Sequence, residues 1–498
     1  MPRIEITLIQ AYNRQDTISE EHKKEGKTFK RRVRPRPDQK KPSLYKSRTA
    51  ATKKERPPLT PREAVVETYS RWIDNHFRID LSAQKTIERW DWETRDRAFF
   101  LEMIYGIVRQ HKRIEWLIRR LGGQKDVPHA KAYACAASGI YQMLFLDRVP
   151  DFAIVDSAVL IARRAHGPAV AGWVNAILRR LGRERDQWVN ASPGSQDKSF
   201  ELSIKYSYPA WMLERWLRQM QNKELENFLT WNNRRPRINL RVNQQKTSVA
   251  ELKDVLSENG IRADISEIDP NFLVIQQTRN PDTLKSVKDG IATVQDHAQG
   301  LVARLVQPTK GEKILDLCAA PGGKAGYIAE ICPECSIIAT DKDPLRLQSV
   351  ENLIRRVGYS NITTLPYDEI LSNRNTYDAI VIDAPCTGTG VLARRPDLRW
   401  RRDPSDVKRM ASVQEQILRY AANRVGAGGR LIYSTCSVEP EENIELIEKF
   451  MEDHPTFRIV SVKDPVLEKL TDDRGVLSKI GSDIKSDGVF AVRLERSK

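Results

Sequence analysis

The stretch KILDLCAAPGGK at residues 313–324 decides the fold of the second half of this 498-residue chain. It opens with a short apolar run typical of a buried strand, and residues 324–331 continue as a helix. Between them, Gly322 and Gly323 let the backbone turn tightly and approach a ligand at the helix N-terminus. The stretch therefore predicts a strand, a cofactor loop and a helix.

The alternation of strands and helices continues from there. Strands are predicted at 313–317, 336–340, 362–365, 379–382 and 430–433, and helices at 324–331, 344–357, 405–425 and 440–451. Strands that are separated by helices usually pair in parallel, so the pattern indicates a doubly wound parallel sheet. We place this α/β domain at residues 296–498.

The glycine-rich loop discriminates among nucleotide-like cofactors. A G-x-G-x-x-G loop for NAD would need glycine where Pro321 stands, and a Walker A loop would need glycine in place of Ala319. S-adenosylmethionine, which carries ribose and adenine but no phosphate, fits what remains. Asp341 ends the second predicted strand and is placed to bind a ribose diol.

Two cysteines follow predicted strands, Cys386 in DAPC at 383–386 and Cys436 in STCS at 434–437. Open α/β sheets bind ligands at strand ends, and a thiolate is a strong nucleophile near neutral pH. A single cysteine is more often a small buried hydrophobic residue, and Cys135, in an alanine-rich helical stretch, keeps that interpretation. Two strand-end cysteines beside a cofactor loop favour a covalently activated substrate.

The residues before the α/β domain form two further regions. From 61 to 190 apolar residues recur at helical spacing, which predicts an all-α domain. Residues 199–295 begin as a helical connector and continue into a small α+β module, in which 237–243 alternate as a half-buried strand does. Eight arginines of the all-α domain are expected on exposed faces, either merely solvated or facing RNA. They are Arg109, Arg113, Arg119, Arg120, Arg163, Arg164, Arg179 and Arg180.

The first 60 residues are strongly basic. They contain 17 Lys/Arg and 7 Asp/Glu, and so carry +10 of the chain's net charge of +16. The run KRRVRPRP at 30–37 has few large apolar groups, which predicts a disordered basic arm over residues 1–60. Attraction to nucleic-acid phosphates is the functional interpretation, and a solubilising tail is the alternative.

Composition favours a cytoplasmic protein. Six cysteines in 498 residues do not make a disulfide framework. Cys332 and Cys335 form one C-x-x-C without a second pair, so no metal site is predicted. No apolar run approaches the length of about 18 residues of a membrane span, and the N-terminus lacks the layout of a signal peptide. We therefore expect no membrane partner.

Three motifs together are specific. The segments at 316–324, 383–390 (DAPCTGTG) and 433–437 (YSTCS), followed by Asn443, resemble the RNA 5-methylcytosine methyltransferases of the NOL1/NOP2/Sun family. The helical domain, through 95–106 and 174–180, resembles the NusB-like domain of that family's bacterial RsmB/Sun branch. The resemblance covers about 61–498 and implies a NusB-like domain, a small RNA-binding module and a Rossmann-like methyltransferase domain. Ala325 and Thr387 depart from the usual Ser/Thr and Ser, and neither change removes a reacting group.

The resemblance implies a function and a site. The function is S-adenosylmethionine-dependent methylation of cytosine carbon 5 in RNA, and the expected substrate is 16S ribosomal RNA. We expect the enzyme to be a monomer. The implied catalytic residues are Cys436 as nucleophile at carbon 6, Cys386 for product release, Asp383 at ring nitrogen 3, and Lys324. The implied cofactor residues are Cys318, Ala319, Ala320, Pro321, Gly322, Gly323 and Lys324 around the methionine part, Asp341 at the ribose, Asp368 near the adenine and Asp383 near the reacting centre.

Three other functions remain open at this point. A DNA cytosine methyltransferase would use the Pro-Cys thiol, Cys386, as its nucleophile, and the Thr-Cys motif at Cys436 argues against it. A transfer RNA cytosine methyltransferase would have the same chemistry on another substrate. A non-catalytic NusB-like RNA-binding or antitermination factor would not need Asp316, Asp341 and both cysteines together.

Overall fold

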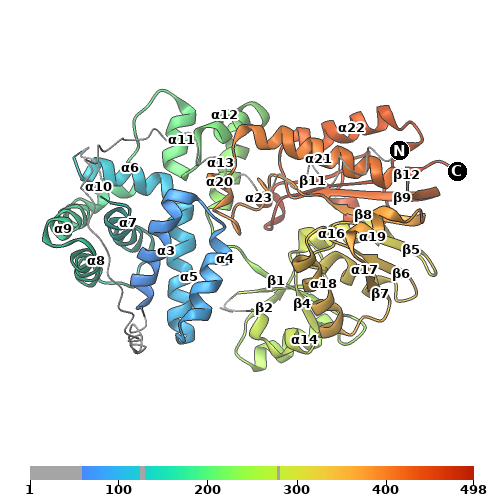
Figure 1. Ribbon diagram of the computed structural model, residues 1–498, viewed down its shortest axis with the longest axis horizontal. Coiled ribbons are helices and arrows are strands. Elements are labelled where there is room, and N and C mark those ends of the chain that lie inside the picture. The colour runs from blue at the N-terminus through green and yellow to red at the C-terminus, as the bar shows by residue number, and fades with distance from the viewer. Residues whose placement is uncertain (1–58, 124–128, 277–280) are drawn as a thin grey trace, which may run out of the picture. The chain divides into compact units, whose positions relative to one another are not determined.

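The computed structural model describes residues 59–123, 129–276 and 281–498 (Figure 1). The predicted basic arm lies almost wholly outside these residues, since 1–58 are not described. The chain divides into Met1–Thr60 and Pro61–Lys498, and the second unit is described below by itself. No helix of the described ranges is long and apolar enough to cross a membrane.

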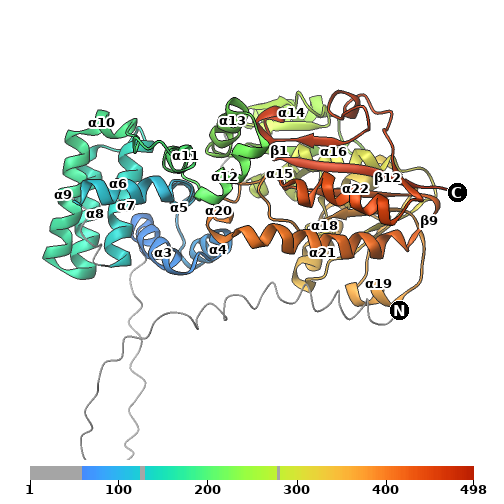
Figure 2. The same ribbon diagram turned by 90° about the horizontal axis from the view of Figure 1, so that it is seen from above.

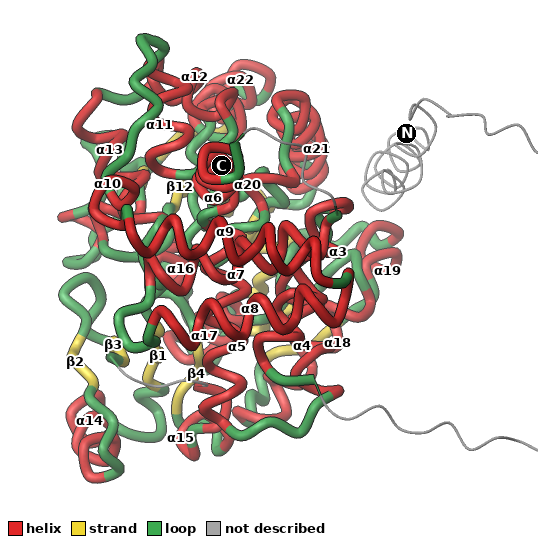
Figure 3. The backbone as a smooth tube through the Cα atoms, turned by 90° about the vertical axis from the view of Figure 1, so that its left-hand side faces the viewer, coloured by secondary structure: helices red, strands yellow, loops and turns green. Residues whose placement is uncertain are grey.

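The N-terminal part of this unit consists of helices (Figure 3). They are α3 (Pro61–Asn75), α4 (Ile79–Arg89), α5 (Thr94–Arg109), α6 (His111–Leu121), α7 (Ala130–Phe145), α8 (Asp151–His166), α9 (Pro168–Arg183) and α10 (Arg185–Val189). The alanine-rich α7 is buried among α3, α5, α6, α8 and α9. Its Cys135 is fully buried, as an inert core cysteine would be. The all-α architecture predicted for this region is confirmed.

Two of the eight arginines that were expected on exposed faces are buried, and the prediction was wrong for them. Arg109 is 8% exposed and donates a hydrogen bond to the carbonyl of Ala393 at 2.9 Å. Arg113 is 7% exposed and donates to the carbonyls of Trp188 and Val189. Helical spacing alone cannot tell such carbonyl-binding arginines from solvated ones. The other six are exposed or half-buried.

A helical connector follows, with α11 (Lys198–Tyr206), α12 (Ala210–Gln219) and α13 (Asn222–Asn232). Its core is aromatic, because Trp216 packs edge-on against both Tyr208 and Phe228. Leu392 and Leu398, from the C-terminal half of the chain, complete the same apolar cluster. The connector is therefore packed against the region that carries Cys386.

Arg399 ties three parts of the chain together. Its side chain is fully buried and donates hydrogen bonds to the carbonyls of Arg109, Ser207 and Asn232. Its guanidinium lies 3.9 Å from the ring centroid of Tyr208, which is a close cation–π contact. Burial lowers the pKa of Arg399 to about 10. The helical domain, the connector and the C-terminal half thus share one buried polar centre.

The small α+β module carries a four-stranded antiparallel sheet with the order β2-β3-β1-β4. Its elements are β1 (Ile238–Val242), α14 (Val249–Glu258), β2 (Ala263–Ile265), β3 (Phe272–Ile275), η1 (Pro281–Thr283), α15 (Lys285–Lys288) and β4 (Ala292–Val294). Ser248 begins α14 with a capping box that it shares with Glu251, which explains the abrupt start of the helix.

The C-terminal half contains the large sheet, with the order β10-β12-β9-β8-β5-β6-β7 and with β11 paired to β12 (Figures 1 and 2). Its strands are β5 (Lys313–Asp316), β6 (Ser336–Ala339), β7 (Ile362–Thr364), β8 (Tyr377–Asp383), β9 (Val425–Thr435), β10 (Phe457–Ile459), β11 (Leu477–Lys479) and β12 (Val489–Arg496). Its helices are α16 (His297–Val306), α17 (Gly323–Ile331), α18 (Pro344–Val357), α19 (Tyr367–Ser372), α20 (Leu398–Arg401), α21 (Pro404–Ala422), α22 (Ile444–Asp453) and α23 (Gly481–Ile484), with 3₁₀ turns η2 (Pro440–Glu442) and η3 (Leu467–Lys469).

The doubly wound sheet is confirmed for β5 to β9, which pair in parallel. The prediction of a wholly parallel sheet was wrong, because β10, β11 and β12 are antiparallel strands. β12 pairs with β9 although α22, β10, β11 and α23 lie between them in the chain, and β10 and β11 have three residues each. Strands this short give almost no periodic signal, which explains why the pattern was read only as far as residue 451.

Candidate active site

The sheet brings the predicted site residues to one edge. β5 and β8 pair with Asp316 opposite Val381, and β8 and β9 pair with Asp383 opposite Ser434. Because parallel strands end at the same edge, the segments that follow β5, β6, β8 and β9 gather there. These segments carry the cofactor loop, Asp341 and both strand-end cysteines.

Cys386 and Cys436 face one another with 3.3 Å between their sulfur atoms. Both side chains are half-buried. The hydrogen bond to Cys436, followed by burial, raises the pKa of the Cys386 thiol well above its ordinary value. Two thiolates at this separation would repel each other, so the pair holds at least one proton.

We expect the two thiols to differ in their pH dependence toward an alkylating reagent. Cys386 should react only at more alkaline pH than an ordinary cysteine, because its thiol form is stabilised. Cys436→Ala should lower the pKa of Cys386, since the variant removes the first cause of the shift. Mass spectrometry of iodoacetamide-treated protein over a pH series measures both rates. An unchanged Cys386 profile in Cys436→Ala would contradict the coupling of the two thiols.

A buried carboxylate lies behind both cysteines. Glu442 is fully buried and accepts hydrogen bonds from the backbone N–H of Thr387 at 2.9 Å and from the hydroxyl of Ser437 at 2.7 Å. These two residues directly follow Cys386 and Cys436. The Thr387 hydroxyl and the Gln414 amide donate to the same carboxylate. Burial raises the pKa of Glu442. The carboxylate therefore clamps the two cysteine loops to each other.

Further side chains fix each loop separately. Asn443 accepts a hydrogen bond from the hydroxyl of Thr435 at 2.6 Å and donates one to the carbonyl of Ser437 at 2.8 Å, which holds the loop on both sides of Cys436. Arg402 donates to the carbonyls of Cys386 and Thr387. Both thiols are thus carried on backbone that is held in place.

Asp383 lies at the end of β8 and is held by two donors. Lys324 of α17 forms an ion pair with one carboxylate oxygen, and the Ser434 hydroxyl donates to the other at 3.0 Å. Lys324 also donates to the amide oxygen of Gln299, and its side chain is only 9% exposed. The buried ammonium thus connects the cofactor loop with Asp383, beside the cysteine pair.

The glycine-rich loop has the geometry that the sequence indicated. Gly322 has φ of +101° and precedes the first turn of α17. A Cβ atom there would come within 2.9 Å of Leu353, so this position requires glycine on two grounds. Asp341 follows β6, is 5% exposed, and accepts hydrogen bonds from the N–H groups of Ala320 and Asp343. Burial raises the pKa values of Asp341 and of the Cys318 thiol.

Asp316, at the end of β5, is the least satisfied of these carboxylates. It is fully buried, and neither of its oxygens has a hydrogen-bond partner within the described residues. Burial raises its pKa to about 7, and the nearby charges of Asp383 and Asp341 act in the same direction. A buried carboxylate without a partner fits a cationic ligand, and S-adenosylmethionine is cationic at both its sulfonium and its amino group.

The remaining predicted residues lie as follows. Asp368 is exposed in the first turn of α19, after β7, at the edge next to Asp341. Cys332 and Cys335 are buried behind the sheet, and among the described residues no group of ligands could hold a metal ion. Glu442 is a functional residue for which the sequence predicted no role, although Asn443 beside it was part of the motif. Its position in the sequence could have indicated a role, because this carboxylate directly precedes Asn443 of the motif.

Comparisons with known proteins show the family of the chain. Residues 303–495 match the family described as 16S rRNA methyltransferase RsmB/F, 59–183 the NusB family, and 208–281 the ferredoxin-like domain of RsmF/B-like methyltransferases. The probable ribosomal RNA small subunit methyltransferase B of Synechocystis is 31% identical over 429 residues, which cover 84% of this chain and 95% of that protein. The ribosomal RNA small subunit methyltransferase B of Cronobacter sakazakii is 34% identical and covers 72% and 83%.

Solved structures give the same picture. The crystal structure of PH0851 is similar with a TM-score of 0.71 and 26% identity, covering 88% of this chain and 99% of that chain. The crystal structure of NSun6 from Pyrococcus horikoshii with SFG has a TM-score of 0.52 and 20% identity, covering 57% and 97%. At that identity the second likeness concerns the fold alone.

Proposed function

We infer the function from one premise: this chain belongs to the ribosomal RNA small subunit methyltransferase B family. It is an RNA methyltransferase that acts on small-subunit ribosomal RNA. We propose that the methylated atom is carbon 5 of a cytosine. The observation that carries this proposal is the pair of thiols 3.3 Å apart beside Asp383. A DNA-type enzyme needs one such thiol, and a NusB-like binding factor needs none.

The proposed mechanism uses both thiols. Carbon 5 of cytosine is a weak nucleophile, and addition of a thiolate at carbon 6 activates it. The Cys436 sulfur forms that bond while Asp383 binds the ring at nitrogen 3. After carbon 5 has gained the methyl group, Cys386 accepts the proton that carbon 5 loses, and the bond from sulfur to carbon 6 breaks. The base must be unpaired or flipped out to reach these groups.

The protonation state of Cys386 fits this order of events. Its thiol is stabilised first by the hydrogen bond to Cys436. Once the Cys436 sulfur is bonded to the base, it accepts a hydrogen bond from the Cys386 thiol less strongly than the free sulfur does. The pKa of Cys386 therefore falls. The half-buried Cys386 can then give its proton to water and become a base. The release step is thus favoured only after the adduct has formed.

We propose S-adenosylmethionine as the methyl donor, since its sulfonium makes the methyl group electrophilic. Residues 318–324 would surround the methionine part, Asp341 the ribose, and Asp368 the adenine side. Asp316 would face positive charge in the same pocket. The Pyrococcus horikoshii structure named with SFG shares the fold of this chain.

Asp341→Ala should weaken the binding of S-adenosylmethionine by about 10- to 100-fold, since hydrogen bonds to a charged group contribute about 1.5–3 kcal/mol. Glu369→Ala, an exposed carboxylate of α19, is the matched control and should bind normally. Isothermal titration calorimetry measures both. Equal affinities in the two variants would remove Asp341 from the ribose site.

The predicted domain roles extend this proposal. We propose that residues 61–190 and the module within 199–295 bind RNA, and that 296–498 perform the chemistry, in a cytoplasmic monomer. The basic arm, 1–60, would add phosphate affinity without choosing the base.

Labelled methyl transfer to ribosomal and transfer RNA tests the substrate. We expect label in 16S ribosomal RNA, and bisulfite sequencing of RNA from cells with and without the gene should show one protected cytosine lost with the gene. Label in transfer RNA alone would favour the alternative substrate. No label in any RNA would refute the enzymatic proposal.

A further inference from the structure

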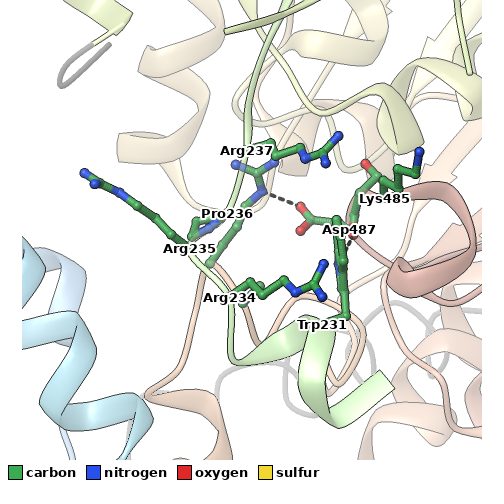
Figure 4. Close-up of a pocket in the computed structure, with 10 residues that line it drawn as sticks. Trp231, Arg234, Arg235, Pro236, Arg237, Lys485 and Asp487 are labelled. Carbon is green, nitrogen blue, oxygen red and sulfur yellow. Dashed lines mark hydrogen bonds and ion pairs between the residues drawn. The ribbon is translucent and has the colours of Figure 1, made fainter. Parts of the chain in front are cut away.

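A pocket lies outside the residues that the mechanism uses (Figure 4). One wall is the segment 234–237, RRPR, which joins α13 to β1. The opposite wall is formed by Ala393, Arg394 and residues 485–487. We call the segment 234–237 the arginine loop. It presents three guanidinium groups within four residues.

The arginine loop carries almost no compensating negative charge. Arg234, Arg235 and Arg237 are all exposed. Arg235 approaches Glu102 only at 3.8 Å, and within the described ranges neither Arg234 nor Arg237 has an ion pair. On the opposite wall, Lys485 pairs with Glu267, but both side chains are exposed and such pairs are weak. The loop therefore offers cations that a ligand can engage at little cost.

Trp231 holds two of these arginines. The guanidinium of Arg234 lies 5.7 Å and that of Arg237 5.8 Å from its ring centroid. The indole N–H donates to the carbonyl of Ser486 at 2.8 Å, which anchors the ring to the opposite wall. Figure 4 shows Arg234 beside Trp231, while Arg235 extends away from the pocket. Cation–π contacts of this kind reduce the freedom that a guanidinium loses on binding.

The acidic groups inside the pocket do not neutralise the loop. Asp487 is nearly buried and pairs with Arg394 at 2.7 Å, and Asp296 pairs with the same guanidinium. Burial, followed by the charge of Asp296, raises the pKa of Asp487 to about 7. Arg394 thus pairs with both carboxylates, and neither of them forms an ion pair with the arginine loop.

Backbone hydrogen bonds connect one wall of the pocket with the loop that carries Cys436. Arg394 belongs to the segment that begins at Cys386 and passes through Gly390. The N–H of Gly390 donates to the carbonyl of Cys436 at 2.8 Å, and the N–H of Gly488 donates to the carbonyl of Gly390 at 2.9 Å. A Cβ atom on Gly390 would lie 2.7 Å from the Cys436 carbonyl oxygen. The wall that carries Arg394 and Asp487 is therefore packed against the backbone of the nucleophile.

We propose that the arginine loop, with Trp231 and Lys485, binds the phosphate backbone of the RNA substrate next to the target cytosine. Guanidinium groups bind phosphate through two parallel hydrogen bonds, and a loop with three of them can follow successive phosphates. Its place beside Cys436 would fix the flanking strand while the base enters the site. This inference rests on the proposed RNA substrate and adds to it a positioning surface.

The test replaces Arg234, Arg235 and Arg237 together by alanine in the full-length protein. RNA affinity should fall about tenfold or more at physiological salt, and the slope of log affinity against log salt should flatten by about two to three. In turnover, KM for RNA should rise more than kcat falls. Affinity for S-adenosylmethionine should stay unchanged, which also shows that the variant folds.

Two further variants separate the site from a general charge effect. Replacing the exposed Lys408, Lys463 and Lys469 by alanine removes the same charge elsewhere on the catalytic half and should change RNA affinity much less. Replacing the three loop arginines by lysine keeps the charge but removes the paired hydrogen bonds that a guanidinium makes to a phosphate. The RNA affinity of this lysine variant should therefore lie between those of the wild type and the alanine variant.

The outcomes are distinct. Equal RNA affinity in wild type and the arginine variant, with the wild type active on RNA, would overturn the inference alone. Equal losses of RNA affinity in the arginine variant and in the control variant of Lys408, Lys463 and Lys469 would also overturn it. Such losses would show that RNA affinity depends on the net charge and not on a particular site. A wild type that methylates no RNA would overturn the proposed function first, and this inference with it.

Discussion

Cys436→Ala should yield neither methylated RNA nor a covalent RNA–protein adduct, whereas Cys386→Ala should accumulate the adduct. The first variant lacks the sulfur that bonds to carbon 6. The second keeps that nucleophile but lacks the base that removes the carbon-5 proton, so the enzyme stays attached to its methylated product. The two sulfurs are only 3.3 Å apart, so a local folding defect caused by either substitution should reduce activity and adduct formation in both variants alike. Opposite outcomes therefore report chemistry.

Denaturing gels with labelled RNA measure the adduct, and labelled methyl transfer measures turnover. Cys135→Ala, a buried cysteine of α7 in an alanine-rich helix, is the matched control and should behave as wild type. An adduct from Cys436→Ala but none from Cys386→Ala would reverse the roles and favour the DNA-enzyme type of mechanism. Full activity in both variants would make the pair ordinary packed cysteines.

Local signals account for what the sequence could predict. The helix predicted at 344–357 begins with Pro344 after the capping residue Asp343 and ends before Gly358, which has φ of +83°, so its boundaries are written in the sequence. β5, β8 and β9 are apolar runs followed by polar motifs, so the strand ends that form the site were predictable as well. The parallel topology then places these strand ends together, because parallel strands end at the same edge of a sheet.

What could not be predicted depends on partners far apart in the chain. The antiparallel pairing of β12 with β9 and the hydrogen bond from Arg109 to the carbonyl of Ala393 both join residues that are far apart in the sequence. The link between Glu442 and Thr387 spans 55 residues. A single sequence without an established fold gives no means to foresee that one carboxylate serves both cysteine loops.

That carboxylate has a particular geometry. One oxygen accepts from two nitrogen donors, the Thr387 backbone and the Gln414 amide, and the other accepts from two hydroxyls, those of Thr387 and Ser437. Nitrogen donors cannot become acceptors, but hydroxyls can rotate. Glutamine at this position can thus place its oxygen toward the nitrogens and its amide toward the hydroxyls. Alanine removes this acceptor from all four groups. The Gln414 amide then keeps only the carbonyl of Pro385 as an acceptor, and the hydroxyls of Thr387 and Ser437 keep their contact with each other.

Glu442→Ala should therefore lower kcat by about 100-fold, the cost expected when reacting groups are displaced by about 1 Å, while affinity for S-adenosylmethionine remains near wild type. Glu442→Gln should lose much less, because it can keep the clamp. The alkylation profile of Cys386 should also shift toward lower pH in Glu442→Ala, because the charge of Glu442 contributes to the raised pKa of that thiol, and general destabilisation would leave that profile alone. Turnover, calorimetry and mass spectrometry on the three proteins test this directly. If Glu442→Ala folds, binds the cofactor and turns over normally, the carboxylate only fills the core and the cysteine loops hold themselves.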